Sequence, residues 1–403
     1  MALAQLYTLG SVIGGQSMSL PRLLILSFTD AGRDPRVFRQ AFFLREKYTI
    51  TLAGLTDPLI KNVEFLPVLR VGKGIISKAW QAANLLVGNI APAQNRFQAG
   101  KELLTRAGQW DLVLVNDVEP LPLGFSLAMG APVVFDAHEY YPKEFEDSLI
   151  WRIFFQRYLT GLCTEFIPRC AGMTTVCHGI AREYQKAFGA VPDIVHSGPA
   201  YQYLSVNPAR SNRIRLIHHG SASPDRCIER MINCMSMLDS RFSLDLYLVG
   251  KGRYFEKLKA LAQGTPNVCW YDPVPMDTLS RVSNTYDVGL FLVPPSTFNL
   301  QHCLPNKFFE FIQARLAIAI GPSPEMVAIV NEYGLGVVAD SFTAEAFARK
   351  LNALTVEDIM RFKQNAAEAA EIFNAEASMK TLEKKLQKVW NAAQRVKKCN
   401  APF

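Results

Sequence analysis

The residues best suited to chemistry lie in the segment HCLPNKFFEFIQARLAIAIGPSPEM, residues 302–326. Pro305 and Asn306 predict the start of a helix, whose free N–H groups and positive dipole end bind phosphate well. Lys307 lies in the first turn, where the dipole disfavours a cation, and an anion bound nearby would resolve this conflict. Glu310, one turn further on, can accept hydrogen bonds from two adjacent hydroxyls, such as those of a ribose. The alternative is an ordinary amphipathic helix with Glu310 in solvent.

Histidines at the ends of predicted strands form a second group of candidates. His138 directly follows the strand PVVFDA. Residues at this place in an α/β fold face the ligand cleft, so His138 is a candidate site residue. The alternative is a histidine at a helix start that is hydrogen-bonded to the backbone. His218 and His219 end another strand and could look like metal ligands. No carboxylate lies within five residues of that pair, however, and the sequence has no Asp-x-Asp motif. A bivalent metal clamp is therefore not indicated.

Short apolar runs alternate with amphipathic stretches from Arg22 onward, which is typical of βαβ units in a parallel sheet. The strands expected in the first half are LLILSF, ITLAGL, VEFLPV, LVLVND, PVVFDA and residues 173–176. A second series follows Pro208, with IRLIHHG, LDLYLVGKG, VCWYD, YDVGLFLV, LAIAIG and GLGVVA. We therefore predict an α/β fold of two facing, doubly wound, Rossmann-like domains, with a ligand cleft at the carboxyl ends of the strands.

The expected organisation has four parts. They are a disordered extension at residues 1–17, a Rossmann-like domain at 18–200, a second Rossmann-like domain at 201–370, and a carboxy-terminal helix with a basic tail at 371–403. Met18 is the expected natural start, and the irregular link GPAYQYLSVNP marks the domain boundary. The last helix is predicted from about Ala366 to Lys398, returning to the first domain.

Composition and charge exclude several classes of protein. The 403 residues are 49% hydrophobic and 20% charged, unlike a disordered, collagen-like or coiled-coil chain. The formal net charge of +7 is concentrated between Lys380 and Lys398, so the rest of the chain does not look like a nucleic-acid binder. This basic helix could contact anionic lipid or phosphate, or simply be a solvated face. Eight cysteines without C-x2-C spacing predict reduced thiols and a cytoplasmic protein.

The order of these pieces resembles the GT-B glycosyltransferases, in particular family four of retaining enzymes, often labelled group 1 glycosyl transferases. The resembling segments of the second half are HHGSASPDR, LDLYLVGKGRYFEKL, NVCWYDPVPMDTL, YDVGLFLVP, LPNKFFEFIQARLAIAIGPSPEMVAIV and GLGVVADSFTAEAFARKL. The first half adds DPRVFRQAFFL, FDAHEYYP and MTTVCHGIAREYQKAFG. The resemblance covers roughly residues 21–370 and implies GT-B architecture, with the nucleotide sugar held by the second half.

The resemblance assigns donor-binding roles to several residues. Glu310 matches the second glutamate of an E-x7-E motif, which holds the donor's ribose, whereas His302 replaces the first glutamate, which faces the donor sugar. Arg226 matches a lysine that neutralises the diphosphate, and Ser221 replaces a second cation. Lys307, Lys251 or Arg253 would compensate for that missing charge. The donor set implied by the resemblance is Gly220, Ser221, Arg226, Lys251, Val274, Leu304, Pro305, Asn306, Lys307 and Glu310.

The first half supplies the acceptor and phosphate side. His138 matches a histidine beside the donor sugar, and Asp136 and Glu139 flank it. The loop TDAGRDPRV stands where the family has a glycine-rich loop against the diphosphate. Gly32 is its only glycine, so an arginine would make the anion contact. The candidates are Arg33, Arg36 and Arg39, with Arg36 first.

The function expected from this resemblance is transfer of a hexose or related sugar from a nucleotide-diphosphate donor to an acceptor hydroxyl, with retention. Catalytic roles fall to His138 and Glu310, with no cofactor and no metal. The setting would be synthesis of cell-surface polysaccharide or glycolipid. A nucleotide-sugar epimerase of the same fold and a non-catalytic glycan-binding protein with a degenerate site are the alternatives.

Two stretches bear on membrane contact. GIISKAWQAANLLVG and IWRIFFQRYL mix aromatic, aliphatic and basic residues, as interfacial helices do, although core packing explains them equally well. If they meet lipid, the acceptor would be a lipid-linked glycan at the inner face of the membrane.

Overall fold

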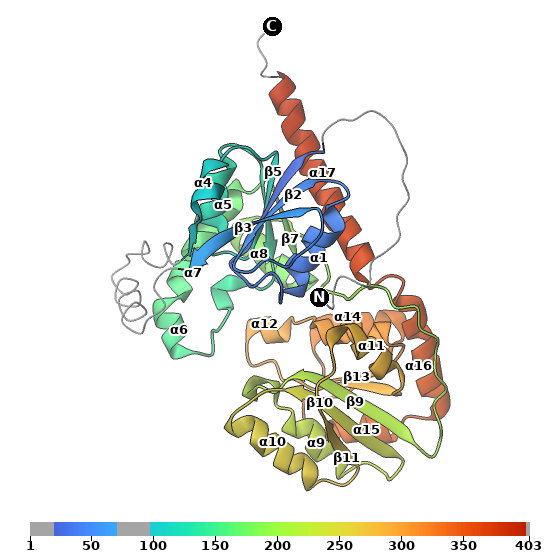
Figure 1. The fold of residues 1–403 in the computed structure, drawn as a ribbon. Helices are drawn as coiled ribbons and strands as arrows, with labels where there is room; N and C mark the ends of the chain where they lie inside the picture. Colours follow the sequence, from blue (N-terminus) through green and yellow to red (C-terminus); the bar gives the residue numbers. More distant parts are fainter. Residues whose placement is uncertain (1–19, 71–96, 400–403) are drawn as a thin grey trace. The chain divides into compact units, whose positions relative to one another are not determined.

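A computed structural model describes residues 20–70 and 97–399 of the chain (Figure 1). Contacts divide these residues into two compact units. The amino-terminal unit consists of residues 20–70, 97–195 and 379–399, and the carboxy-terminal unit is His196–Ser378. The expected extension at 1–17 and the stretch GIISKAWQAANLLVG lie outside the described residues. Within the described residues, no helix has the length and apolar character needed to cross a membrane.

The amino-terminal unit is built on an eight-stranded sheet in the order β4-β3-β2-β1-β5-β6-β7-β8. The strands are β1 Arg22–Leu26, β2 Thr49–Gly54, β3 Val63–Arg70, β4 Phe97–Ala99, β5 Leu112–Asn116, β6 Val133–Ala137, β7 Gly172–Thr175 and β8 Asp193–Ile194. Neighbours pair in parallel except β3 and β4. All residues of β5 and β6 are buried, as expected of central parallel strands covered on both faces.

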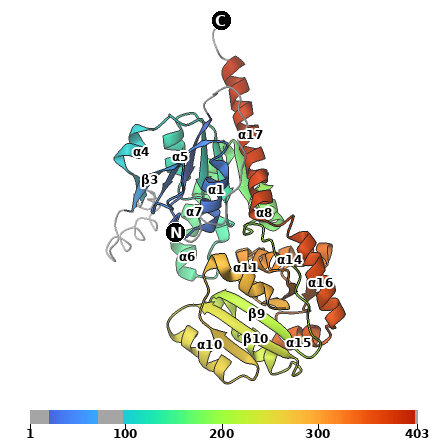
Figure 2. The same ribbon diagram turned by 45° about the vertical axis from the view of Figure 1, so that its right-hand side comes forward.

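Helices cover this sheet, as Figures 1 and 2 show. They are α1 Pro35–Leu44, α4 Lys101–Thr105, α5 Leu121–Ala128, α6 Leu149–Phe154, α7 Gln156–Phe166 and α8 His178–Phe188, with short 3-10 turns at Tyr141–Lys143 and Ile167–Arg169. Helix α1 begins where the Asp34 side chain accepts from the N–H groups of Arg36 and Val37. The last helix, α17 (Ala375–Cys399), joins this unit from Met379 onward.

The carboxy-terminal unit contains a six-stranded, all-parallel sheet in the order β11-β10-β9-β12-β13-β14. Its strands are β9 Ile214–Ser221, β10 Phe242–Val249, β11 Val268–Tyr271, β12 Val288–Phe291, β13 Ala317–Ile320 and β14 Gly336–Val338. Strand order reverses between β9 and β12, so the carboxyl ends of these two strands border the crevice in which such sheets bind ligands.

The helices of the carboxy-terminal unit pack on both faces of its sheet. They are α9 Glu229–Met235, α10 Arg253–Gln263, α11 Met276–Asn284, α12 Phe298–Gln301, α13 Asn306–Gln313, α14 Pro324–Tyr333, α15 Ala344–Asn352 and α16 Val356–Ala369, with a 3-10 turn at Pro224–Arg226. Helices α10 and α15 lie on one face and α11 and α14 on the other in both views (Figures 1 and 2).

The structure corrects the prediction of one long terminal helix from about Ala366. Helix α16 ends at Ala369 and α17 begins at Ala375. The Gln313 side-chain amide donates to the carbonyls of Ala370 (2.7 Å) and Phe373 (2.9 Å). This buried amide therefore stabilises the non-helical backbone between α16 and α17. Periodicity alone cannot detect such a tertiary contact.

Candidate functional site

A pocket of about 350 Å³ opens in the carboxy-terminal unit where β9 ends and α13 begins. Its lining brings together eight of the predicted donor-side residues: Gly220, Ser221, Arg226, Val274, Pro305, Asn306, Lys307 and Glu310. Six further residues complete the lining: His219, Tyr247, Val249, Pro273, Met276 and Leu279. The site therefore combines charged groups at the helix start with an apolar wall, as small-molecule sites do.

Helix α13 starts at Asn306 as predicted, because extended Pro305 precedes it and an apolar face follows. Phe308, Phe309 and Ile312 are fully buried and anchor the helix to the sheet. No side chain caps its start and its first turn holds no acidic residue. The helix therefore presents N–H groups and a positive dipole end to the pocket, with no acidic side chain in its own first turn to neutralise them.

Lys307 lies in this first turn and is nearly buried, although a lysine there opposes the helix dipole. Its Nζ atom lies 3.4 Å from Nε2 of His218 and 5.5 Å from the ring centre of Phe291. Burial, together with the positive charge of Arg226, lowers the pKa of Lys307 to about 7. A bound anion would favour the charged amine, so Lys307 is poised to take up a proton with its ligand.

The hydrogen bonds of His218 define its neutral tautomer. Nδ1 lies 2.8 Å from the carbonyl oxygen of Leu290, which only accepts, so Nδ1 carries the proton. Nε2 is then the acceptor facing Lys307. Burial and the charge of Lys307 hold the pKa of His218 well below its usual value, so this ring stays neutral.

Glu310 faces a second neutral histidine. Its Oε2 atom lies 3.6 Å from Nε2 of His219, whose ring packs edge-on against Phe311 at 5.1 Å. Burial and the charge of Lys307 lower the pKa of His219 to about 3. The neutral ring leaves the Glu310 carboxylate able to accept hydrogen bonds from a ligand.

Gly220 allows the close approach of Lys307 to β9. Its φ of +115° is one that other residues rarely adopt, and an added Cβ would lie 3.0 Å from Nζ of Lys307. Arg226, in the turn after β9, pairs with Asp225 at 3.4 Å and also lines the pocket. Two cations therefore border the start of α13.

The remaining predicted donor residues lie elsewhere in the carboxy-terminal unit. Leu304 is buried, and Lys251 and Arg253 are exposed at the start of α10; the pocket lining includes none of the three. His302 pairs with the carboxylate of Glu325 through Nδ1 at 3.0 Å, and both side chains are largely buried.

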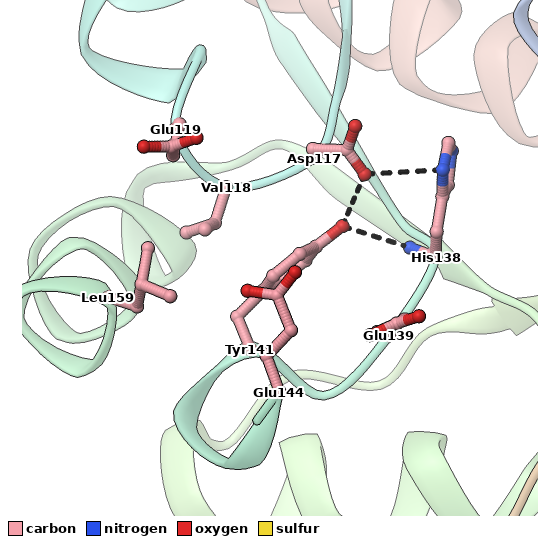
Figure 3. A pocket seen from close by; sticks show the side chains of 8 residues that line it. All are labelled: Asp117, Val118, Glu119, His138, Glu139, Tyr141, Glu144 and Leu159. Atoms are coloured by element: carbon pink, nitrogen blue, oxygen red, sulfur yellow. Dashed lines mark hydrogen bonds and ion pairs between the residues drawn. The ribbon is translucent and has the colours of Figure 1, made fainter. Parts of the chain in front are cut away.

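A second pocket, of about 230 Å³, lies in the amino-terminal unit beside the ends of β5 and β6 (Figure 3). Its lining is Asp117, Val118, Glu119, His138, Glu139, Tyr141, Glu144 and Leu159. His138 and Glu139 were predicted here. Asp117 follows β5 and faces His138, which follows the neighbouring β6.

Four oxygen atoms surround His138. Nδ1 lies 3.2 Å from Oδ1 of Asp117, and Nε2 lies 3.2 Å from Oδ1 of Asn116 and 3.4 Å from Oδ2 of Asp136. The backbone N–H of His138 donates to the Tyr141 hydroxyl (3.4 Å), which donates in turn to Asp117 (Figure 3). Burial alone would lower the pKa of His138, but Asp117 and Asp136 outweigh it and raise that pKa.

The structure places Arg36 in a different role from the predicted anion contact. Its guanidinium is buried and donates to both oxygens of Asp136, at 2.7 and 2.6 Å, and to the carbonyl of Val195 at 2.8 Å. Asp136 is fully buried and does not line the pocket. The reason is tertiary: the carboxylate of Asp136 at the end of β6 lies opposite the first turn of α1 and requires a buried cation.

The other predicted residues near α1 differ in exposure. Arg39 is also buried. Arg33 is largely exposed and lies 3.7 Å from Asp30, and the N–H of Gly32 donates to the Asp30 side chain at 3.2 Å. Neither Gly32 nor Arg33 belongs to the lining of the pocket beside His138.

Asp117 and Tyr247 line the two pockets but were not among the predicted site residues. Asp117 is the last residue of the predicted strand LVLVND, so the rule that functional residues lie at the carboxyl ends of strands could have selected it. Tyr247 lies within β10 and stacks on Tyr271 with ring centres 5.1 Å apart. The alternating pattern of a strand does not indicate which of its residues will line a pocket. No group of His, Cys, Asp or Glu side chains that could hold a metal ion occurs in the described part of the chain.

Comparison with solved structures identifies the architecture. HepE of Anabaena, in a crystal structure with UDP, matches with a TM-score of 0.66 and 14% identity over 91% of this chain and 100% of that chain. The trehalose-6-phosphate synthase of Burkholderia multivorans matches with a TM-score of 0.63 and 11% identity over 96% and 100%. WaaG, a glycosyltransferase involved in lipopolysaccharide biosynthesis, gives 0.63 and 13% over 90% and 99%.

These structural neighbours are GT-B glycosyltransferases, and the chain has the GT-B fold. The predicted fold class is thereby confirmed. No protein-family model and no curated protein matches the sequence itself. At identities of 14% and below, the structural likeness establishes the fold alone.

Proposed function

We propose that this protein is a glycosyltransferase that moves a sugar from a nucleotide-diphosphate donor to an acceptor hydroxyl with retained configuration. The observation that carries the proposal is the pocket of the carboxy-terminal unit, where the uncapped start of α13, Arg226 and Lys307 face the same space as Glu310. Cations and a helix start suit a diphosphate, and a carboxylate one turn away suits the adjacent hydroxyls of a ribose.

Each charged group has a distinct part in the proposed reaction. Arg226, protonated Lys307 and the N–H groups at Asn306 stabilise the negative charge that develops on the departing diphosphate. Glu310 orients the nucleoside and so holds the reacting carbon in place. His138, in the amino-terminal unit, acts beside the transferred sugar.

The ligands bound in the structures of HepE suggest the donor to try first. HepE was crystallised with UDP, with UDP and glucose, and with UDP-glucose. Carried to this chain as a proposal, the donor is a uridine diphosphate sugar. The apolar wall of Tyr247, Pro273, Val274, Met276 and Leu279 offers a surface on which a flat base can pack.

We also propose a lipid-linked glycan acceptor and peripheral membrane contact. The stretch IWRIFFQRYL begins within α6, where Leu149, Ile150 and Ile153 are exposed, and Phe145 is exposed beside them. Exposed apolar groups beside Arg152 are typical of an interfacial helix. Co-sedimentation with vesicles of anionic phospholipid tests this, and equal recovery of wild type and Ile150→Ser/Ile153→Ser with the vesicles would contradict it.

The experiment that tests the proposed reaction is release of UDP from UDP-glucose, with and without candidate acceptors. We expect slow hydrolysis that a suitable acceptor accelerates, and a loss of more than about 100-fold in turnover for Glu310→Ala. Glu256→Ala, an exposed glutamate on α10, is the matched control. Equal turnover by Glu310→Ala and wild type would remove Glu310 from the site.

A non-catalytic nucleotide-sugar-binding protein is the second candidate. His302 and Ser221 favour it, because each stands where the resemblance implies a charged donor contact. Tight binding of UDP-glucose with neither hydrolysis nor transfer to any acceptor would support this candidate over the enzyme.

A further inference from the structure

The protonation state of His138 follows from a chain of hydrogen bonds that begins at Asp136. Its carboxylate accepts from Nε and Nη2 of Arg36 (2.7 and 2.6 Å), from the Gln40 side-chain amide (2.6 Å) and from the Thr174 hydroxyl (2.6 Å). Burial would raise the pKa of Asp136, but Arg36 outweighs it and lowers that pKa far below the usual range. Asp136 is therefore ionised and can only accept.

An acceptor at Asp136 fixes the orientation of two side-chain amides. Gln40 must direct its NH2 group to Asp136, which leaves its Oε1 atom as an acceptor. Asn116 must then direct its own NH2 group to Oε1 of Gln40, at 2.8 Å. The Oδ1 atom of Asn116 is left facing Nε2 of His138 at 3.2 Å. Nε2 therefore meets only an acceptor in Asn116 and must carry a proton.

Nδ1, the other ring nitrogen of His138, also faces an acceptor. Oδ1 of Asp117 lies 3.2 Å from Nδ1 and also accepts a hydrogen bond from the Tyr141 hydroxyl. Burial, together with Asp117, raises the pKa of Tyr141 well above its usual value, so the phenol remains a donor. Asp117 holds this position with φ of +67°, a backbone conformation that Asp and Asn tolerate better than most residues.

We infer that His138 is held as a doubly protonated imidazolium, with Asp117 as the positioning residue that fixes its charge and ring orientation. The inference rests on acceptors at both ring nitrogens. The charged groups that face the ring are Asp117 after β5, Asp136 on β6 and Arg36 on α1. Two carboxylates against one guanidinium give a local surplus of negative charge that the imidazolium balances.

This state determines what His138 can do in catalysis. A histidine with both nitrogens protonated and bonded to protein acceptors cannot remove a proton from the acceptor hydroxyl. It provides a fixed positive charge beside the pocket of the amino-terminal unit instead, able to stabilise negative charge that develops during transfer. The protonation state stands on geometry, whereas this electrostatic role rests on the proposed function.

Nuclear magnetic resonance of full-length protein labelled with 15N-histidine tests the protonation state without any substrate. We expect the His138 ring, identified by its loss in His138→Gln, to keep two protonated nitrogens to a higher pH than an ordinary histidine. In Asp117→Asn, which keeps the shape and tolerates the same φ, the acid dissociation constant of His138 should rise at least about tenfold. A neutral ring in wild type, or an unchanged constant in Asp117→Asn, would overturn the inference.

The kinetic arm separates this inference from the proposed function. Asp117→Asn should lower kcat with little change in KM for the donor, and should introduce an ionisation near neutral pH that wild type lacks. Asp147→Asn, an exposed carboxylate in the same unit, is the control and should match wild type. Wild-type kinetics in Asp117→Asn would overturn the electrostatic role. If wild type transfers no sugar at all, the proposed function fails, while the resonance data still decide the protonation state.

Discussion

The Nζ atom of Lys307 lies 3.4 Å from Nε2 of His218, in a first helical turn that disfavours a cation. Its pKa of about 7 predicts pH-dependent ligand binding. A diphosphate binds the charged amine better, so affinity should fall as pH rises above 7, by up to about tenfold per pH unit. Isothermal titration calorimetry with UDP in two buffers of different ionisation heat measures this proton uptake. Persistence of the same uptake in Lys307→Met would contradict the assignment to Lys307.

The same buried amine makes a prediction for stability. The pKa of Lys307 is lower in the folded protein than the ordinary value of 10.5, so the unfolded chain binds more protons between pH 7 and 10.5. The contribution of Lys307 to the free energy of unfolding therefore rises with pH in that window. Urea unfolding should show Lys307→Met to be more stable than wild type at pH 6, with a smaller difference at pH 9. A difference that grows from pH 6 to pH 9 would have the wrong sign.

Gly220→Ala tests whether the close approach of the Lys307 amine to β9 matters for ligand binding. Both Gly220 (φ +115°) and Gly252 (φ +86°) adopt conformations that alanine resists, but an added Cβ at Gly252 meets no atom within 4 Å. We expect each substitution to lower the free energy of unfolding by roughly 1–3 kcal/mol. Only Gly220→Ala should also weaken UDP binding, because its Cβ displaces the amine. Equal UDP affinity in both variants would argue against this contact.

The buried pair of Arg36 and Asp136 predicts a large stability effect in the amino-terminal unit. Arg36→Met leaves the Asp136 carboxylate without its cation, so the free energy of unfolding should fall by about 3–5 kcal/mol at pH 7. Because the pKa of Asp136 is lowered by folding, this stabilisation is present above its unfolded pKa and is lost as pH falls below it. Chemical unfolding at pH 7 and pH 3 measures both effects. Arg33→Met, at an exposed arginine, should behave as wild type; a similar loss there would show that the effect is not specific to the buried pair.

The central strands and the start of α13 could be predicted because each has a local signal. Branched apolar runs define the central strands, and the position of Asn306 after Pro305 predicts where α13 begins. The edge strands β4 and β8 have three and two residues, too few to form a pattern, so they were not predicted.

Buried charges could not be predicted from local pattern. Arg36 was expected to contact a bound anion, yet its side chain is 4% exposed and pairs with Asp136, 100 positions away. The break after Ala369 likewise depends on Gln313, which is distant in sequence. The contact between His138 and Asp117 forms only because the ends of β5 and β6 lie side by side.

Titration of UDP into wild type and Glu310→Ala tests the central claim most directly, because it needs neither the acceptor nor the sugar. We predict saturable binding by wild type and by the Glu256→Ala control, and at least about tenfold weaker binding by Glu310→Ala. Titration of other nucleoside diphosphates against wild type would identify the base. Failure of wild type to bind any of them, or equal affinity in Glu310→Ala, would contradict the assignment of this pocket to a nucleoside diphosphate.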